Sequence, residues 1–474
     1  MHLNKKTKIV CTIGPATESE AQLAKLLKAG MNVMRLNFSH GDFAEHQNKV
    51  NNLKKAIFKT GIPAAIMQDL SGPKFRIGDF YKDRVTLKAG DYITLTPEKV
   101  VGDEKKVSIN YPNLAKELKV GNMIMVDDGK KQFQVEEIIG KDLKCKIIIG
   151  GETKGRRGVN LPGAYLKVSS LTDKDKKDLA FGIKNKVDIV AFSFVRTKDD
   201  VIELRGLLDK AKSKAMVLSK IETQEAVDNI DEIIALSDAL MVARGDLAVE
   251  IGAENVPSFQ KTLIRKCNEA GKPVITATQM LESMIKSPVP TRAEVSDVAN
   301  AIVDGTDAIM LSEETTLGDY PIEAVNVMTR VAMKTENSFI NKQVVREVNN
   351  KPGLLSVRRS TTCSAVRISN EIGAAHILSL TNSGNGARLL SSYKPLEPIF
   401  VFTPNPVTAQ QVILSYGCYP VLIKKFAGFD AAFQVIRAYM LKNKLAKKND
   451  QVVIATGVPF GKSKTANAVM VETL

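Results

Sequence analysis

The sequence predicts an α/β protein: a (β/α)₈ barrel with an inserted all-β lid domain and a C-terminal α/β domain of the doubly wound type. Three observations lead to this prediction. Short apolar runs alternate with amphipathic stretches up to residue 342, one long segment within them changes to a period of two, and the alternation resumes after residue 342. Strand–helix alternation requires a parallel sheet with right-handed crossovers, and about eight such units close a barrel.

The barrel strands are predicted from runs that are short, apolar and rich in β-branched residues. Between most of them lie segments with helical spacing and with start and stop signals. In the first, Ser19 caps the helix, Leu23, Leu26 and Leu27 share one face, and Gly30 ends it. The eight predicted strands are residues 7–13, 31–38, 64–70, 188–194, 215–221, 239–245, 273–279 and 308–314.

The inserted domain is predicted over residues 71–162, where short alternating strands with turn signals replace the barrel pattern. It follows the third barrel strand. Because insertions at the carboxyl ends of barrel strands lie over the active site, it is a candidate lid. The barrel then comprises residues 1–70 and 163–342, and the C-terminal domain residues 343–474. Strands of that last domain are expected within residues 374–380, 398–402, 419–425 and 451–457.

Composition excludes several classes of protein. With 474 residues, 44% hydrophobic and 25% charged, the chain is expected to be globular and to form several domains. Five cysteines without a CxxC pair and four histidines without close spacing argue against zinc and a disulfide framework. No apolar run is long enough to cross a bilayer and none opens the chain. We therefore expect a cytoplasmic protein with no membrane partner.

The net charge of +15 is the one unusual property of the composition. It points either to an anionic partner, nucleic acid or phosphorylated metabolites, or to lysines spread over solvated helix faces such as residues 173–186. Aromatic content is 5% and there is no Trp, so few side chains are available to stack on bases. Nucleic-acid binding is not expected as the main function.

Polar and charged side chains gather where the predicted barrel strands end. This rim carries the active site in barrels of this class, although some polar residues are expected there from loop composition alone. A lysine, arginines and several carboxylates converging on one rim favour a functional site. These strand-end residues are Arg35, Asn37, Ser39, Asp69, Ser193, Arg196, Lys220, Glu222, Arg244, Asp246, Thr278, Gln279, Ser312, Glu313 and Glu314.

Glu222 and Asp246 follow adjacent strands, so their carboxylates are placed to share one hard cation such as Mg²⁺. Lys220 lies two residues before Glu222, and both side chains therefore point to the same side of the strand. An ammonium at this place suits a developing enolate or a phosphoryl group in transfer. The alternatives are carboxylates that favour helix starts and a strand-end lysine with its head in solvent.

Five blocks of the chain resemble pyruvate kinases, and the resemblance runs from end to end. They are KIVCTIGPAT (8–17), MNVMRLNFSHG (31–41), LSKIETQEAVDNIDEII (218–234), ALMVARGDLAVEI (239–251) and the long block from Thr276 to Pro321. The resemblance implies a TIM barrel, a lid and a regulatory C-terminal domain. It implies transfer of a phosphoryl group from phosphoenolpyruvate to ADP, giving pyruvate and ATP in the last step of glycolysis. The cofactor would be Mg²⁺ or Mn²⁺, and the assembly a homotetramer.

The resemblance also implies roles for individual residues. Lys220 would stabilise the transition state, and Glu222 and Asp246 would bind the divalent cation. The substrate would contact the side chains of Arg35, Lys220, Asp246 and Thr278 and the backbone of Ala243, Arg244 and Gly245. Thr278 would lie near the face where the enolate is protonated. Ser312 and Glu314 would belong to the surrounding hydrogen-bond network. The nucleotide would contact Arg76, Arg157, Asn37 and His40, with Asp127 and Asp128 near it on the lid. Relatives usually have lysine at the position of Arg157, which keeps the charge but changes its shape.

One departure from the family pattern concerns K⁺. Most members hold K⁺ on residues that match Asn37, Ser39, Asp69 and the carbonyl of Leu70, and they have glutamate where this chain has Lys74. An ammonium there supplies the positive field that the ion otherwise provides. We therefore hypothesise that K⁺ is not required, against the alternative of an incidental surface lysine.

A second departure lies in the loop that binds an effector phosphate in members activated by sugar phosphates. Thr381, Ser383 and Gly384 are kept here, but Asn385 and Gly386 replace the hydroxyls and the arginine common in that loop. Activation by fructose bisphosphate is therefore not expected. Two rival functions remain: a Mg²⁺-dependent lyase or aldolase acting on a pyruvate-like acid, and a basic RNA-binding protein built on the barrel.

Overall fold

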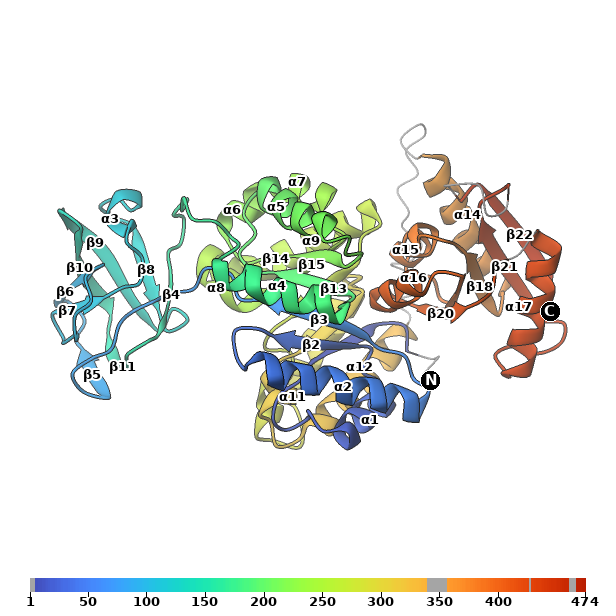
Figure 1. The fold of residues 1–474 in the computed structure, drawn as a ribbon, viewed down its shortest axis with the longest axis horizontal. Coiled ribbons are helices and arrows are strands. Elements are labelled where there is room, and N and C mark those ends of the chain that lie inside the picture. The colour runs from blue at the N-terminus through green and yellow to red at the C-terminus, as the bar shows by residue number, and fades with distance from the viewer. Residues whose placement is uncertain (1–4, 339–355, 426–427, 460–465) are drawn as a thin grey trace.

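The computed structural model describes residues 5–338, 356–425, 428–459 and 466–474. Three bodies lie in a row, with the barrel between the inserted β domain and the C-terminal domain (Figure 1). The expected boundary between residues 342 and 343 falls outside the described residues. No helix within the described ranges is both long and apolar enough to span a bilayer.

The predicted barrel is confirmed. Eight strands close in the order β1-β17-β16-β15-β14-β13-β3-β2, and each strand pairs with its neighbours in parallel. All eight predicted runs contain one of these strands. They are β1 (Lys8–Thr12), β2 (Val33–Asn37), β3 (Ala65–Leu70), β13 (Ile189–Phe192), β14 (Met216–Ile221), β15 (Ala239–Ala243), β16 (Val274–Ala277) and β17 (Ala308–Leu311).

The barrel helices begin and end largely as the sequence signals indicate. In α1 the Ser19 hydroxyl accepts from the Gln22 N–H and Gly30 ends the helix with φ 127°, a value that favours glycine. The helices around the barrel are α1 (Glu20–Ala29), α2 (Phe43–Thr60), α4 (Asp173–Asn185), α5 (Lys198–Lys210), α6 (Gln224–Asp228), α7 (Ile230–Leu236), α8 (Arg244–Ile251), α9 (Val256–Ala270), α10 (Arg292–Val303), α11 (Glu313–Thr316) and α12 (Pro321–Glu336).

The inserted domain has its own sheet and its own apolar core. A seven-stranded sheet in the order β4-β12-β8-β9-β10-β6-β7 lies beside a ribbon of β5 and β11. One short helix, α3 (Leu114–Glu117), lies between β7 and β8 in the sequence. The strands are β4 (Phe75–Arg76), β5 (Arg84–Leu87), β6 (Tyr92–Thr96), β7 (Lys106–Ser108), β8 (Met123–Val126), β9 (Lys131–Ile139), β10 (Asp142–Ile149), β11 (Gly151–Lys154) and β12 (Gly158–Asn160).

The C-terminal domain is doubly wound, with strand order β20-β19-β18-β21-β22. Only β22 is antiparallel, and the sequence prediction missed this edge strand. The strands are β18 (His376–Leu380), β19 (Ile399–Thr403), β20 (Cys418–Leu422), β21 (Gln451–Thr456) and β22 (Ala468–Thr473), and the helices are α14 (Val357–Ile372), α15 (Asn385–Ser392), α16 (Pro406–Gln411) and α17 (Phe429–Lys442).

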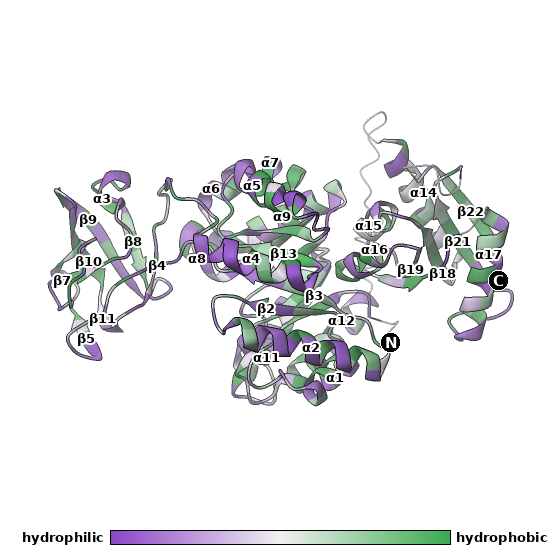
Figure 2. Ribbon diagram, in the orientation of Figure 1, coloured by the Kyte–Doolittle hydropathy of each residue, from purple (hydrophilic) through white to green (hydrophobic). Residues whose placement is uncertain are grey.

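Apolar side chains concentrate in the strands and the polar ones on the outer helix surfaces (Figure 2). Every residue of β1, β3, β13, β14, β15, β16 and β17 is buried, as expected for parallel strands with side chains inside and helices outside. All five cysteines are free thiols.

Candidate active site

A cluster of buried charges lies at the carboxyl ends of β2, β3 and β14. The Arg35 Nε donates to Asp69 Oδ2 at 2.7 Å, and the Lys220 Nζ lies 3.3 Å from Asp69 Oδ1. Lys220 also donates to the Ser193 hydroxyl at 2.6 Å and lies 2.9 Å from Glu222 Oε1. All of these side chains are buried, with Asp69 only 1% exposed. Five of the strand-end residues named from the sequence, Arg35, Asp69, Ser193, Lys220 and Glu222, therefore lie in contact.

The ionisation of this cluster follows from burial and from opposite charges. Burial favours the neutral carboxyl, but Lys220 and Arg35 outweigh it and lower the pKa of Asp69. Burial also works against the ammonium, but Asp69 and Glu222 outweigh it and raise the pKa of Lys220. Lys220 is therefore held as a cation, as an anion-stabilising residue must be.

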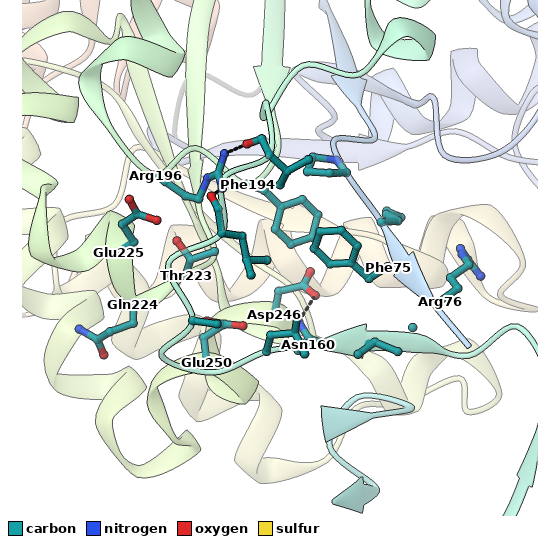
Figure 3. A pocket seen from close by; sticks show the side chains of 18 of the residues that line it. Phe75, Arg76, Asn160, Phe194, Arg196, Thr223, Gln224, Glu225, Asp246 and Glu250 are labelled. Carbon is teal, nitrogen blue, oxygen red and sulfur yellow. Dashed lines mark hydrogen bonds between the residues drawn. The ribbon is translucent and has the colours of Figure 1, made fainter. Parts of the chain in front are cut away.

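The two carboxylates expected to hold a metal are arranged differently. Glu222 Oε2 accepts the Phe194 N–H at 2.7 Å, while Oε1 faces Lys220. Asp246, in the first turn of α8, accepts a weak bond from the Asn160 side chain at 3.4 Å (Figure 3). Burial raises the pKa of Glu222, and the negative charge of Asp246 adds to the effect. Two neighbouring carboxylates that repel each other are stabilised by a cation between them.

The donor set fits a hard divalent cation. Within the described part of the chain no group of three or more His, Cys, Asp or Glu side chains is placed to hold a metal. The candidate ligands are the two carboxylates of Glu222 and Asp246. Mg²⁺ is commonly held by one or two carboxylates, and water and substrate oxygens complete its octahedron. Glu222 and Asp246 thus fit Mg²⁺ and do not resemble a zinc site.

Around Thr278, the backbone is strained and held by its neighbours. Thr278 has φ 71°, in the left-handed region, and its hydroxyl accepts the Gly245 N–H at 3.0 Å. The Arg244 guanidinium donates to the carbonyls of Ala277 and Thr278 and forms an ion pair with Asp297 at 2.7 Å. The Arg244 side chain therefore holds the loop after β16 in place.

Glu314 and Ser312 connect two rim loops. The Glu314 carboxylate accepts the Ser312 N–H at 2.7 Å and the Leu281 N–H at 3.1 Å. Burial raises the pKa of Glu314, and these amides oppose the shift. Glu314 therefore joins the loops after β16 and β17 on the side of Thr278.

A cavity of about 350 Å³ opens between the barrel rim and the inserted domain (Figure 3). Barrel residue Asp246 faces it together with residues of the inserted domain. Asp127 and Asp128 form the tight turn between β8 and β9, both with positive φ, and Arg157 Nε lies 3.5 Å from Asp127 Oδ1. The predicted site residues that line this cavity are Lys74, Arg76, Asp127, Asp128, Arg157, Arg196 and Asp246.

Lys74 lies where the sequence hypothesis placed it. Its ammonium donates to the Ser39 hydroxyl at 2.8 Å, and the Ser39 N–H donates to Asn37 Oδ1 at 3.1 Å. The carbonyl of Leu70 accepts the Ser193 hydroxyl at 2.7 Å. His40 follows Ser39 in the sequence, and its N–H donates to the Asn37 carbonyl. Lys74 therefore occupies the neighbourhood of the groups matched to a K⁺ site.

The expected effector loop lies apart, after β18 in the C-terminal domain. The Gly384 N–H donates to the Thr381 hydroxyl at 3.0 Å, and the Ser383 carbonyl accepts from Arg388 at 3.0 Å. The Gly384 amide, one of the donors expected to hold an anion, is thus bonded within the loop itself.

Sequence reasoning missed several residues of the cavity. Asn160 contacts Asp246, and Glu225 and Glu250 line the wall with Phe75. Burial raises the pKa of the Glu250 carboxyl to about 7. Asn160 could have been noticed, since it lies in the block that follows Arg157. No local sequence signal marks Glu225 or Glu250, because both lie in segments with ordinary helical patterns.

Comparison with known proteins assigns the whole chain. Residues 4–325 match the family "Pyruvate kinase, barrel domain", and residues 359–472 match "Pyruvate kinase, alpha/beta domain". The chain belongs to the pyruvate kinase family. It is therefore a phosphotransferase, and the family resemblance noted in the sequence is confirmed.

Individual pyruvate kinases are similar over nearly their full length. The chain is 43% identical to the pyruvate kinase of Clostridium acetobutylicum, covering 99% of this chain and 100% of the relative. Identity is also 43% to pyruvate kinase 2 of Synechocystis and to the Staphylococcus aureus pyruvate kinase, with 80% of each relative covered. A crystal structure of a pyruvate kinase from Cryptosporidium parvum superposes with a TM-score of 0.94 at 35% identity, over 99% of this chain and 96% of that one.

Proposed function

We propose that this chain transfers the phosphoryl group of phosphoenolpyruvate to ADP, giving pyruvate and ATP, with Mg²⁺ or Mn²⁺ as cofactor. The observation that carries the proposal is the contact of Lys220 with Glu222 at 2.9 Å beside Asp246, which brings a buried ammonium next to a carboxylate pair. Family membership supports the same reaction.

Charge neutralisation is the main task of this site. A divalent cation held by Glu222 and Asp246 would supply positive charge to phosphoryl and enolate oxygens. Lys220 contributes a second positive charge, fixed in place by Asp69 and Ser193. Arg35, which donates to Asp69, contributes a third positive charge. Groups that are fixed in advance in this way need no rearrangement when the anion forms.

Positioning falls to the rim loops and the lid. The Thr278 hydroxyl accepts the Gly245 N–H on the barrel rim, and its proposed role is to hold a proton or a water for the protonation of the enolate. Arg76, Arg157, Asn37 and His40 are proposed to bind the nucleotide, since Arg76 and Arg157 line the cavity from the inserted domain. Closure of that domain would exclude water that otherwise intercepts the phosphoryl group.

The enzyme is proposed to work without K⁺. Lys74 donates to Ser39, one of the groups matched to the K⁺ site, and places a positive charge there. We further propose a cytoplasmic homotetramer. We propose no activation by fructose bisphosphate, because Asn385 and Gly386 stand where the family's effector loop has hydroxyls and an arginine, and the Gly384 amide donates to Thr381 within the loop.

A coupled assay of ATP formation tests the function. Purified protein with phosphoenolpyruvate, ADP and Mg²⁺ should form ATP, and Lys220→Met should reduce kcat by about 10²–10³-fold. Circular dichroism of the variant checks that it is folded under the assay conditions. Absence of ATP, with cleavage of a pyruvate-like acid instead, would identify a lyase or aldolase. Adding sugar phosphates to the same assay tests the regulatory proposal, which a large leftward shift of the phosphoenolpyruvate curve contradicts.

A further inference from the structure

The segment that leads from the lid back to the barrel, residues 163–170, belongs structurally to the lid. It follows β12 and forms neither helix nor strand. Ala164, Leu166 and Val168 pack against the apolar core of the inserted domain. The Lys167 N–H donates to Glu117 of α3 at 3.0 Å. We call residues 163–170 the return segment.

Arg196, in the loop after β13, joins this return segment to the barrel. Its Nη1 donates to the Leu166 carbonyl and its Nη2 to the Val168 carbonyl, and Nη2 also lies 3.2 Å from the Ser170 hydroxyl. Backbone carbonyls outside regular structure need such partners, and the guanidinium fork suits two carbonyls at once. Arg196 is itself held by Asn229, which donates to its carbonyl at 3.2 Å.

Phe194 extends this connection to the carboxylate pair. Its carbonyl accepts the Ser170 hydroxyl at 2.9 Å, and its N–H donates to Glu222 Oε2 at 2.7 Å. Its φ of 53° lies in the left-handed region, so these two contacts hold a backbone conformation that phenylalanine does not favour. One short piece of backbone therefore contacts the lid on one side and Glu222 on the other.

We propose that Arg196 is a positioning residue that fixes the return segment against Phe194 and thereby sets the orientation of the Glu222 carboxylate. Lid position and the geometry of the carboxylate pair are then coupled through three residues, Ser170, Phe194 and Arg196. The inference rests on the proposed role of Glu222 as a metal ligand. A residue that orients a metal ligand typically changes metal affinity by about 10–100-fold when it is removed.

The test uses the full-length protein with three variants, Arg196→Gln, Arg196→Lys and Ser170→Ala. Mn²⁺ binding is measured by electron paramagnetic resonance of the free ion, and deuterium exchange is followed in peptides that cover residues 163–170. Arg196→Gln should weaken Mn²⁺ binding about tenfold and speed exchange in the return segment. Arg196→Lys should restore part of both, because one ammonium reaches one carbonyl but does not span two. The control is Arg265→Gln, on the exposed face of α9, which should leave both unchanged.

Each outcome decides whether Arg196 couples the position of the lid to the metal-binding carboxylates or only anchors the lid to the barrel. Faster exchange with unchanged Mn²⁺ affinity overturns the proposal, because Arg196 then only anchors the lid. If Arg196→Gln does not fold, the other two variants decide, and wild-type Mn²⁺ affinity in both overturns it. The proposed function fails separately: the wild-type protein then forms no ATP from phosphoenolpyruvate and ADP, while the binding measurement still ranks the variants.

Discussion

A buried ion pair joins the barrel to the C-terminal domain, and its contribution to stability is open to measurement. Lys394 Nζ lies 2.9 Å from Asp307 Oδ1, with the two side chains 8% and 3% exposed. At this distance an effective dielectric constant of about 20 gives an attraction of about 6 kcal/mol before the cost of burial. Burial lowers the pKa of Lys394 and Asp307 opposes the shift, so desolvation offsets much of this attraction.

Removing both partners is expected to cost less free energy of unfolding than the sum of the two single removals. Lys394→Met leaves the Asp307 carboxylate with neutral hydrogen-bond donors only: the N–H groups of Tyr416 at 2.9 Å and Val274 at 3.1 Å, and the Ser391 hydroxyl at 3.2 Å. An uncompensated buried charge costs about 3–5 kcal/mol. Asp307→Asn should have a similar cost, and the double variant should recover at least ~1 kcal/mol of the sum.

Urea denaturation followed by circular dichroism at 222 nm measures this cycle, since the chain has no Trp to report fluorescence. The control cycle is Arg265 with Glu269, which has the same 2.9 Å separation but side chains 62% and 52% exposed. Its coupling should not exceed about 0.5 kcal/mol. Equal coupling energies in the two cycles would refute the reasoning, because burial would then make no difference.

Two further predictions concern ions and pH. Lys74→Glu should create a dependence on added KCl in the ATP-forming assay, because the charge beside Ser39 is inverted; activity that stays low with and without KCl contradicts this. Burial raises the pKa of Asp188 to about 6, opposed by the bond that its carboxylate accepts from the Ile66 N–H at 2.8 Å. A raised carboxyl pKa means stability that is full at low pH and is lost as pH rises through about 6. The wild-type protein should therefore lose about 3 kcal/mol between pH 4 and pH 8 at this site, and Asp188→Asn should remove that loss; denaturation midpoints of both proteins at the two pH values check it.

The sequence was sufficient for the barrel because each of its strands lies in a short, mostly apolar run with polar residues near or just after its end. Lys220 and Glu222 could be placed together for the same reason, since the period of a strand puts residues two apart on one side. Edge strand β22, from Ala468 to Thr473, was missed although it begins with four apolar residues, and in the structure its residues are mostly part-exposed, unlike those of a central strand. The short helix α3 was missed because four residues carry no periodicity.

The parts of the site that escaped prediction depend on contacts between distant segments. Arg196 was noticed as a strand-end residue, but nothing in its surroundings showed that it contacts carbonyls of residues 166 and 168. Likewise Asn160 contacts Asp246 across 86 positions of sequence. Such pairings are set by the packing of the lid on the barrel, which local patterns do not encode.

The amino-terminal opening of the barrel is closed by another part of the chain. Ile413 and Leu414, from the C-terminal domain, are 3% and 0% exposed and share one apolar cluster with barrel-interior residues such as Val10 and Met310. The apolar interior of the barrel is thus covered at this end by two residues of the C-terminal domain. A truncated polypeptide ending at residue 338 would present that apolar interior to water and should aggregate, so the catalytic part of this enzyme is not a portable module.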